Sequence, residues 1–472
     1  MDATTKDHPV PEAVPALERL RARMSGPLIE PTDAAYEQAR GVWNRTIDRY
    51  PLAIAQVADV DDVPAVLEAA RETGLPLAVR GGGHSIAGLG TVDDGIVLDL
   101  GALREIQVDP ESALVTAGPG ARAADVDAAT APHGLAVPLG TVSKPGIAGL
   151  TLGGGVGWLT RSAGLTLDRL ERAEVVTAAG EQLVASANEH PDLFWGLRGG
   201  GGNFGVVTSF TYRAVRLPAT VMGATLLYRA GQWRQALQAF ERWARDLPDE
   251  MSATATVTVL PQSRGLGDEP WLMIRCVRVG EDPGRGEMLV ARLRETAPPD
   301  QQEMGPVSWL QWQSAQDDMF PERTRAFWRN MTLARLDQDA LEALLDVAGL
   351  ITARGIAIDL QHLGGAFTRV KDGATAFPHR SPRFRMNVYG VWQDPADDAR
   401  ARAVAYRSFE VLGRLTEQGE YVNLRALEHT HPVTDFTRRI YGEETYRRLQ
   451  RIKQRYDPHN LFRTNYNVAP EM

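Results

Sequence analysis

Glycine is concentrated in four short segments of this chain, and these segments constrain the fold more than any other feature. They are residues 81–83, 118–120, 146–157 and 199–205. Glycine clusters cost backbone entropy, and they serve either turns with positive φ or the close approach of bare N–H groups to an anion. Most of these segments adjoin a predicted strand. Together they indicate a large phosphorylated cofactor held along its length, and the alternative is four tight turns in a compact α/β domain.

Two widespread phosphate-binding motifs do not account for these glycines. The chain has no Gly-x-x-x-x-Gly-Lys-Ser/Thr sequence, which argues against a P-loop. Gly200, Gly202 and Gly205 have the Gly-x-Gly-x-x-Gly spacing, but they follow a predicted helix and precede a predicted strand. A dinucleotide-binding Rossmann site needs the opposite order, so the sequence disfavours it.

Hydrophobic patterning divides the chain at about residue 217. Before this point, a strand at 52–57, a helix at 63–73 and a strand at 77–79 form a βαβ pattern that leads into the first glycine segment. After it, the glycine clusters end and helices alternate with strands, which predicts an α+β arrangement with antiparallel pairing. The predicted helices are 231–245, 286–296 and 337–348, and the predicted strands are 252–260, 272–279, 355–363 and 383–392.

Composition excludes several classes of protein. The net charge of −9 shows no basic excess, so we expect no nucleic-acid partner. No run of about 18 apolar residues is present, and we expect no membrane span. The only cysteine, Cys276, excludes an intrachain disulfide and suits a reducing cytoplasm, and no secretory signal is visible at the start. The nine histidines lack ligand spacing, apart from the weak pair His429 and His431, so we expect no metal site.

Four motifs, in order, resemble those of the vanillyl-alcohol-oxidase-type flavoproteins and, more narrowly, their berberine-bridge-enzyme-like branch. They run from Arg80 to Asp99, Gly140 to Trp158, Leu193 to Thr208 and Tyr456 to Asn467. The resemblance is strong over residues 45–218, good in the C-terminal tail and scattered between them. It implies an α+β, two-domain PCMH-type FAD-binding fold with an α+β substrate domain built on an antiparallel sheet. The implied domains are an FAD-binding domain at 1–217 (core about 46–217), a substrate-binding domain at 218–442 and a C-terminal return at 443–472.

The resemblance also implies that His84 carries FAD covalently, through a ring nitrogen bonded to the flavin 8α-methyl carbon. Imidazole is partly neutral near pH 7 and is nucleophilic, as such a bond requires. Many relatives attach FAD a second time through a cysteine, but Val142 occupies that position here. We therefore expect attachment through histidine alone; the alternative is that His84 only hydrogen-bonds a phosphate.

The same resemblance implies a set of FAD contacts. Residues 81–83 and Ser85 would face the pyrophosphate, residues 140–142 the isoalloxazine, Val207 the adenine and two asparagines of the tail the flavin pyrimidine edge. The full set is Arg80, Gly81, Gly82, Gly83, His84, Ser85, Gly88, Leu89, Gly118, Leu139, Gly140, Thr141, Val142, Gly146, Gly149, Gly153, Gly155, Val207, Asn465 and Asn467.

A flavin that takes a hydride needs a nearby group to remove a proton from the substrate. Tyr421, in Tyr421-Val422-Asn423, matches a family motif whose tyrosine is a proposed base, and Tyr466 is a second candidate. Either could instead be a packed aromatic with a satisfied hydroxyl. Gln361, His379 and Asn423 are candidates for the substrate pocket. Strand alternation places either Gln361 or His362 toward the flavin.

The resemblance implies an FAD-dependent oxidoreductase, most simply an oxidase of a CH–OH or CH–NH group in a small or medium organic substrate, with O₂ as acceptor. A dehydrogenase with another acceptor and an oxidative cyclase remain open, and a non-catalytic ligand-binding relative is the alternative outside enzymes. Monomer and homodimer are both compatible with the sequence, which does not identify the substrate.

Overall fold

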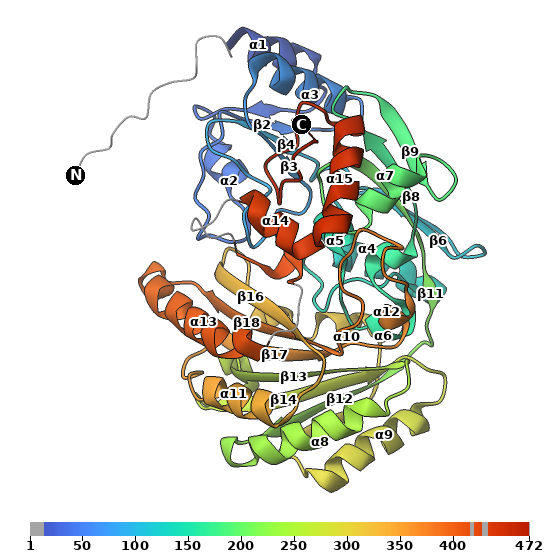
Figure 1. Ribbon diagram of the computed structural model, residues 1–472, viewed down its shortest axis with the longest axis vertical. Helices are drawn as coiled ribbons and strands as arrows, with labels where there is room; N and C mark the ends of the chain where they lie inside the picture. The colour runs from blue at the N-terminus through green and yellow to red at the C-terminus, as the bar shows by residue number, and fades with distance from the viewer. Residues whose placement is uncertain (1–13, 416–419, 427–432, 472) are drawn as a thin grey trace.

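The computed structural model describes residues 14–415, 420–426 and 433–471. The chain forms two parts that are stacked along the long axis of the molecule (Figure 1). The upper part contains the strands up to residue 216 together with the C-terminal helices, and the lower part is built on one wide sheet. His429 and His431 lie outside the described residues.

The top of the molecule holds a four-stranded sheet in the order β1-β2-β4-β3. Its strands are β1 (Leu28–Ile29), β2 (Ala53–Gln56), β3 (Leu77–Arg80) and β4 (Ile96–Asp99). β2, β4 and β3 run parallel, which requires a crossover between β2 and β3. Helix α3 (Asp62–Thr73) is that crossover; it ends at Gly74, whose φ is 66°. The predicted βαβ unit is confirmed, and it places the first glycine segment at the end of β3.

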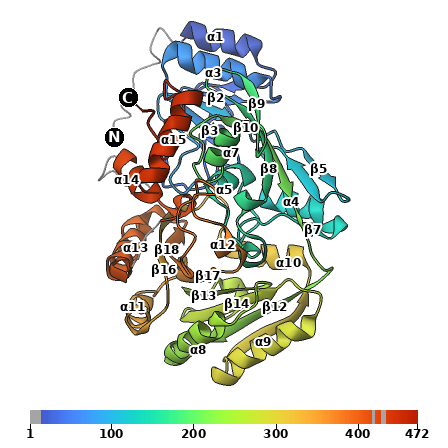
Figure 2. The ribbon, with the colours of Figure 1, turned by 45° about the vertical axis from the view of Figure 1, so that its right-hand side comes forward.

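A second, five-stranded sheet is antiparallel throughout, in the order β5-β6-β10-β8-β9. Its strands are β5 (Ile106–Asp109), β6 (Leu114–Ala117), β8 (Leu170–Val176), β9 (Gln182–Ser186) and β10 (Val206–Arg213). Helices α4 (Ala123–Thr130) and α7 (Pro191–Leu197) belong to this region, and a short pair, β7 (Leu135–Ala136) with β11 (Val215–Arg216), lies beside them. The four- and five-stranded sheets lie side by side in both ribbon views (Figure 2).

The third glycine segment, residues 146–157, is not a loop throughout. Residues Ile147–Gly153 form helix α5, and Gly146 is its N-cap. Each glycine inside a helix costs about 1 kcal/mol relative to alanine. Burial of Ile147 and Leu152 against the five-stranded sheet offsets that cost. Gly149 lies on the open side of the helix, where an added Cβ would meet no atom within 4 Å.

The lower part is a seven-stranded antiparallel sheet in the order β15-β12-β14-β13-β17-β18-β16. Its strands are β12 (Val221–Tyr228), β13 (Met251–Val259), β14 (Pro270–Arg278), β15 (Gln301–Val307), β16 (Arg325–Leu333), β17 (Ile356–His362) and β18 (Phe384–Trp392). The antiparallel α+β lower part is therefore as predicted, although β12, β15 and β16 had not been recognised in the sequence.

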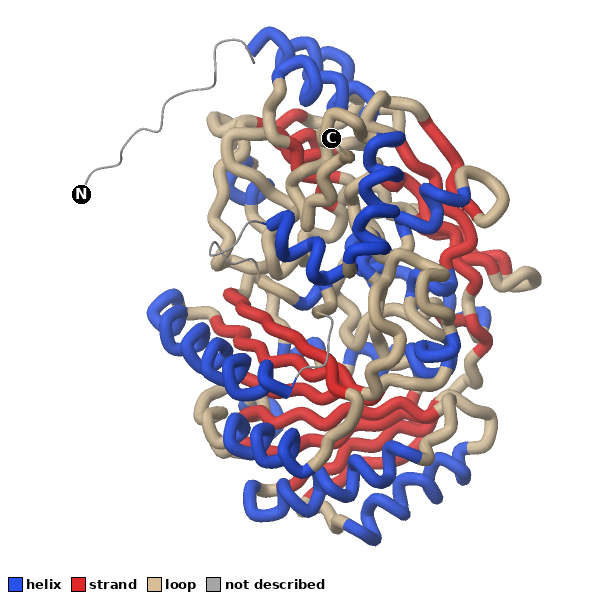
Figure 3. Tube along the Cα trace, viewed as in Figure 1, coloured by secondary structure: helices blue, strands red, loops and turns tan. Residues whose placement is uncertain are grey.

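The two faces of this sheet differ in chemistry. Ala255, Ile358 and Met386 point to the lower face, where they share a core with helices that cover that face (Figure 3). These helices are α8 (Trp233–Arg245), α9 (Pro283–Thr296), α11 (Gln338–Ala348) and α13 (Asp398–Leu412). Side chains alternate along a strand, so the neighbouring polar residues point to the upper face, toward the rest of the chain.

The end of the chain returns to the upper part. The 3₁₀ turn η8 (Val422–Leu424) precedes helices α14 (Val433–Tyr441) and α15 (Glu443–Tyr456). Phe436 and Ile440 of α14 share a core with Leu449 of α15 and with the five-stranded sheet. The return therefore includes α14, which precedes residue 443; the exact domain limits stay a prediction.

Five further α-helices belong to the described chain. They are α1 (Val14–Arg23), α2 (Tyr36–Arg40), α6 (Thr160–Ala163), α10 (Trp309–Ser314) and α12 (Ala366–Arg369). Within the described ranges, no helix is both long and apolar enough to cross a membrane. The same residues contain no group of three or more His, Cys, Asp or Glu side chains arranged to hold a metal ion.

Candidate active site

A cavity of about 360 Å³ lies between the upper part and the polar face of the seven-stranded sheet. Its lining runs from Trp43 near the start of the chain to Tyr466 near the end. Glycine segments form the upper wall, and β13, β16, β17 and β18 supply side chains to the lower wall. The cavity thus joins the two kinds of residue that the sequence singled out, the glycines and the candidate bases.

The upper wall is a cradle of bare backbone formed by residues 81–83, Gly146, Gly149 and residues 200–202. A Cβ on Gly82 would lie 2.5 Å from the Cα of Gly146, and a Cβ on Gly146 would lie 2.6 Å from the Cα of Gly82. Any larger residue at either position would push the two segments apart. By contrast, a Cβ on Gly149 or on Gly202 would meet nothing within 4 Å, because both face open space. Such a surface lets a phosphate approach the backbone N–H groups.

Arg80 ends β3 directly before this cradle and is buried. Its Nη2 donates a hydrogen bond of 2.9 Å to Oδ2 of Asp99 on the neighbouring parallel strand. This ion pair neutralises the guanidinium, and Nη1 has no hydrogen-bond partner. The side chain therefore fixes the end of β3 and leaves one donor group uncommitted beside the cradle.

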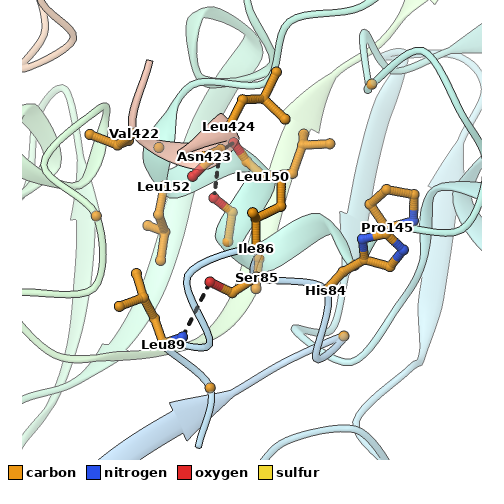
Figure 4. Close-up of a pocket in the computed structure, with 18 of the residues that line it drawn as sticks. His84, Ser85, Ile86, Leu89, Pro145, Leu150, Leu152, Val422, Asn423 and Leu424 are labelled. Atoms are coloured by element: carbon orange, nitrogen blue, oxygen red, sulfur yellow. Dashed lines mark hydrogen bonds between the residues drawn. The ribbon is translucent and has the colours of Figure 1, made fainter. Parts of the chain in front are cut away.

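His84 follows the cradle glycines and lines the cavity beside Pro145 (Figure 4). Its ring stacks on the indole of Trp43, with 4.2 Å between ring centroids and 17° between planes. Its Nε2 is enclosed and has no hydrogen-bond partner. Burial, with a further contribution from the positive charges of Arg122 and Lys144, lowers the pKa of His84 to about 4. The imidazole is therefore neutral at pH 7 and its free nitrogen lone pair is available.

Tyr421 lies across the cavity, in the turn that precedes α14. Its hydroxyl oxygen accepts a 2.8 Å hydrogen bond from the N–H of Gly155 and a 3.0 Å hydrogen bond from Nδ2 of Asn423. A Cβ on Gly154 would lie 2.8 Å from the Tyr421 ring, so the glycine is needed for this close approach. Asn423 also donates to the carbonyl of Gly149, which ties the turn to α5 (Figure 4).

The surroundings of Tyr421 act on its acidity in opposite directions. Burial raises its pKa, whereas the Arg385 guanidinium and the donors of Gly155 and Asn423 lower it; burial is the largest effect. Arg385 lies 4.9 Å from the centre of the Tyr421 ring. Arg385 was not among the site residues predicted from the sequence. A negative charge on the Tyr421 oxygen would thus meet two hydrogen-bond donors and a guanidinium.

The lower wall is a row of polar side chains in register across three strands. Asp359 accepts hydrogen bonds from Thr256 (2.9 Å) on β13 and from Asn387 (3.1 Å) on β18. At the next residue pair on the same face of β17 and β18, Arg385 donates a 2.5 Å hydrogen bond to Gln361. Nε and Nη1 of Arg385 have no hydrogen-bond partner. Of these residues the sequence analysis had named only Gln361. The available signal was a polar residue at every second position of strands that are otherwise apolar.

An aromatic surface adjoins this polar row. The rings of Trp328 and Tyr389 stack with centroids 4.0 Å apart, and Phe320 lies 5.9 Å from each of them. All three line the cavity. The wall opposite the cradle therefore offers a polar region and an apolar region side by side.

Most of the predicted site residues come together here. The predicted residues that line the cavity are Arg80, Gly81, Gly82, Gly83, His84, Ser85, Leu89, Gly140, Thr141, Val142, Gly146, Gly149, Gly153, Val207, Gln361, Tyr421, Asn423, Asn465 and Tyr466. Gln361 faces the cavity, whereas the ring of His362 lies away from it beside Arg161. The alternation of β17 thus decides between the two residues that the sequence left open.

Other predicted residues lie away from the lining: Gly88, Gly118, Leu139, Gly155, His379 and Asn467. A Cβ on Gly118 would lie 2.3 Å from the carbonyl oxygen of Leu103, so this glycine allows two backbone segments to pack closely. Leu139 belongs to the core beside the five-stranded sheet. His379 has a φ of 58°, and its ring hydrogen-bonds the backbone of Ile440.

Tyr466 lines the cavity with its ring only. Its hydroxyl donates a 2.9 Å hydrogen bond to the carbonyl of Arg425, and burial raises its pKa. Because that proton is committed to a backbone oxygen, Tyr421 is the tyrosine whose oxygen is surrounded by donors. The geometry thereby favours Tyr421, the first candidate from the sequence, over Tyr466.

The glycine cradle and the histidine beside it form a surface that suits a large phosphorylated cofactor. Residues 51–186 match the family model of the FAD-binding domain, and residues 420–469 match that of berberine and berberine-like proteins. The chain is 29% identical to (R)-6-hydroxynicotine oxidase of Paenarthrobacter nicotinovorans over 95% of its length and 97% of that protein. It belongs to the berberine-bridge-enzyme-like FAD-linked oxidoreductases, as its sequence motifs indicated.

Solved structures agree with this assignment. The structure of 6-hydroxy-D-nicotine oxidase from Arthrobacter nicotinovorans matches with a TM-score of 0.84 and 27% identity, over 95% of this chain and 98% of that one. A berberine-bridge-enzyme-like protein of the moss Physcomitrella patens matches with a TM-score of 0.85 and 22% identity, over 96% of this chain and 99% of that one, which shows the shared fold. The predicted fold class is confirmed.

FAD is the cofactor of these enzymes, and the cavity fits it. Open space lies over Gly149 and Gly202, where backbone N–H groups are bare. Two residues of the lining each carry a buried polar atom without a hydrogen-bond partner in the chain, Nη1 of Arg80 and Nε2 of His84, as is typical of groups beside a polar ligand. Residues 81–83, Gly146 and Gly149 would hold the pyrophosphate.

Proposed function

We propose that this protein is an FAD-dependent oxidase that carries its flavin covalently through His84 alone. It oxidises a CH–OH or CH–NH group of a small or medium organic substrate, with dioxygen as electron acceptor. The observation that supports this proposal is the continuous cavity in which the glycine cradle and a neutral histidine face Tyr421 and a polar sheet wall. The oxidase relative at 29% identity supports the same class of reaction.

Two features of the chain support attachment through His84 alone. The imidazole is neutral, and its Nε2 makes no competing hydrogen bond. Val142 lines the cavity at the position where relatives attach FAD through cysteine, and the only thiol, Cys276, is buried in β14 of the lower sheet. A buried free thiol also fits a reducing compartment such as the cytoplasm.

A group of the protein must then accept one proton from the substrate. When bound, the flavin supplies the hydride acceptor. The carbon that loses the hydride carries an O–H or N–H group, and the proton of that group has to leave as well. Tyr421 accepts this proton at Oη. Its negative charge is stabilised by Gly155, Asn423 and Arg385, and burial makes the ionised form the minor one at neutral pH. Asp359, Asn387 and Gln361 bind polar groups of the substrate, and the aromatic surface holds its apolar part.

Two measurements test this function. Acid precipitation of the purified protein should leave yellow, fluorescent protein, and His84→Ala should release the flavin into the supernatant. A screen of alcohols, amines and sugars, followed as peroxide release, should identify the substrate class. Slow reoxidation of the reduced protein in air would reject the oxidase and leave a dehydrogenase. A product that contains a new ring and has lost only the two electrons of the hydride step would identify an oxidative cyclase. A colourless protein that binds no FAD would reject enzymatic function altogether.

A further inference from the structure

Trp43, which the sequence analysis did not notice, is in contact with the histidine that is proposed to carry the flavin. Its indole covers one face of the His84 ring at 4.2 Å, nearly parallel to it. Its backbone N–H donates a 3.0 Å hydrogen bond to the carbonyl of Gly83, the residue before the histidine. Both residues line the cavity. A change at Trp43 therefore acts directly on the orientation of the imidazole.

The neighbours of Trp43 hold it rigidly. Its indole Nε1 donates a 3.1 Å hydrogen bond to the carbonyl of Pro321 in the lower part of the chain. The next residue, Asn44, is fully buried and bridges the two parts through its side-chain amide. Nδ2 donates to the carbonyls of Ile86 (2.8 Å) and Ala326 (3.0 Å), and Oδ1 accepts from the N–H of Ala326 (2.9 Å). The indole is thus a fixed platform between the histidine loop and the edge strand β16.

Stacking has two consequences for the imidazole. It fixes the ring about its side-chain torsions, and because the contact is made by a ring face, it uses neither ring nitrogen. It also keeps water from one face, which disfavours the charged form. The charged groups that act on His84 are Arg122 and Lys144. Nη1 of Arg122 lies 3.6 Å from Oε1 of Glu322, and Nζ of Lys144 donates to the carbonyls of Asp317 and Phe320. Both cations oppose protonation as well.

We propose that Trp43 is a positioning residue for covalent attachment of FAD, holding the His84 imidazole neutral and aligned toward the flavin 8α carbon. This inference rests on the proposed attachment at His84. In the net reaction a bond forms between the imidazole nitrogen and the 8α carbon, the N–H and one C–H bond break, and two electrons and two protons leave. Dioxygen takes them as hydrogen peroxide, so the step balances. An aligned nitrogen matters because such a bond forms only from a near-attack geometry.

The test follows attachment itself rather than turnover. Full-length protein produced in a riboflavin-limited host is mixed with FAD, samples are quenched with acid, and covalent flavin is read as fluorescence in a denaturing gel. The variants are Trp43→Phe, which keeps a stacking ring, Trp43→Leu, which keeps apolar volume only, and Trp43→Ala. Phe320→Leu is the matched control because Phe320 lines the same cavity without stacking on His84. His84→Ala defines the signal without attachment.

At pH 7.5 we expect Trp43→Leu and Trp43→Ala to attach FAD at least about tenfold more slowly than the wild type, while Trp43→Phe and Phe320→Leu stay within about threefold. The pH profile gives a second readout that a purely structural role would not change. The wild-type rate should be level between pH 5.5 and 7.5, because the pKa of His84 is about 4. In Trp43→Ala, water reaches the ring, its pKa rises toward about 6.5, and the rate at pH 5.5 falls about tenfold.

Attachment by Trp43→Leu at the wild-type rate would overturn the inference, and this variant decides even if Trp43→Ala does not fold. A level pH profile in a folded Trp43→Ala protein would overturn the claim that the stack keeps the histidine neutral. Acid-stable flavin in His84→Ala would instead refute the proposed attachment site. The Trp43 variants thus test the inference, whereas His84→Ala tests the proposed function on which it rests.

Discussion

The side chain of Asn330 holds the proposed base in place, and its removal should lower the rate of the reaction through Tyr421. Asn330 is fully buried on β16. Its Nδ2 donates to the carbonyls of Tyr421 (2.9 Å) and Leu424 (2.8 Å), and its Oδ1 accepts the N–H of Tyr421 at 2.6 Å. These three hydrogen bonds fix both ends of the turn that carries the tyrosine. Asn330→Ala removes all of them and leaves the tyrosine hydroxyl unchanged.

The size of the effect can be worked out from these contacts. Each hydrogen bond contributes about 0.5–1.5 kcal/mol net, so the turn loses about 1.5–4.5 kcal/mol of local stability, enough for it to move. A misplacement of about 1 Å at a reacting group costs about 100-fold in rate, whereas Tyr421→Phe, which removes the base, should cost about 100- to 10,000-fold. If Asn330 acts only through Tyr421, then Asn330→Ala should slow the Tyr421→Phe protein by less than about threefold.

The assay is anaerobic flavin reduction, followed by absorbance after mixing with the substrate from the screen, for the two single variants and the double variant. Asn387→Ala is the matched control, since Asn387 pairs directly with Asn330 across β18 and β16 but bonds Asp359 instead of the turn. Its effect should multiply with that of Tyr421→Phe. If Asn330→Ala slowed the Tyr421→Phe protein as much as it slows the wild type, the idea that Asn330 positions the base would be refuted.

Three further predictions concern other parts of the molecule. Burial raises the pKa of Asp127 to about 7, so the stability that its neutral form contributes is complete below about pH 3.8 and is lost as the pH rises through 7. Asp127→Asn should therefore gain roughly 3 kcal/mol relative to the wild type between pH 5 and pH 8 in denaturant unfolding, and a pH-independent difference would contradict this. Gly149→Ala should lower the FAD content of the purified protein without lowering the melting temperature of the flavin-free form, because its Cβ meets only the space proposed for the cofactor; unchanged FAD content would place the cofactor elsewhere. The rate of flavin reduction should rise about tenfold per pH unit near neutral pH, since burial raises the pKa of Tyr421, and this slope should vanish in Tyr421→Phe.

The sequence predicted the upper part of the molecule well because its signals are local. A strand, an amphipathic helix ended by Gly74 and a second strand lead directly to residues 81–83. The secondary-structure predictions were wrong where tertiary packing outweighs the local preference of the backbone. Gly149 and Gly153 disfavour a helix, yet α5 forms because Ile147 and its apolar neighbours are buried. β15 was missed since Gly305 and Pro306 interrupt its pattern.

The lower wall was harder to foresee, because its chemistry depends on register between distant strands. Arg385 and Asp359 each follow an ordinary alternating pattern, and nothing local shows that β17 and β18 bring them to one face beneath the cradle. Trp43 contacts His84, which lies 41 positions further along the chain, and Asn330 contacts Tyr421, which lies 91 positions further along. Single-sequence patterns report which side of a strand a residue occupies, but they do not report what the other part of the chain places opposite it.

The placement of these groups makes the proposed chemistry depend on how the two parts of the chain are joined. His84 and the cradle belong to the upper part, whereas Asn330 holds Tyr421 from the lower sheet. Arg161 of α6 fastens the parts together, because its guanidinium donates to the carbonyls of Leu247 (2.9 Å), Met251 (2.8 Å) and Leu363 (2.6 Å) of the lower part. A flavin attached to His84 is fixed to the upper part, whereas the turn that carries the base is held by Asn330 of the lower part. Loosening the joint at Arg161 alone, with the contacts of Trp43 and Asn44 intact, should therefore separate two properties that usually fall together: FAD would remain attached, while the proton transfer at Tyr421 would be lost.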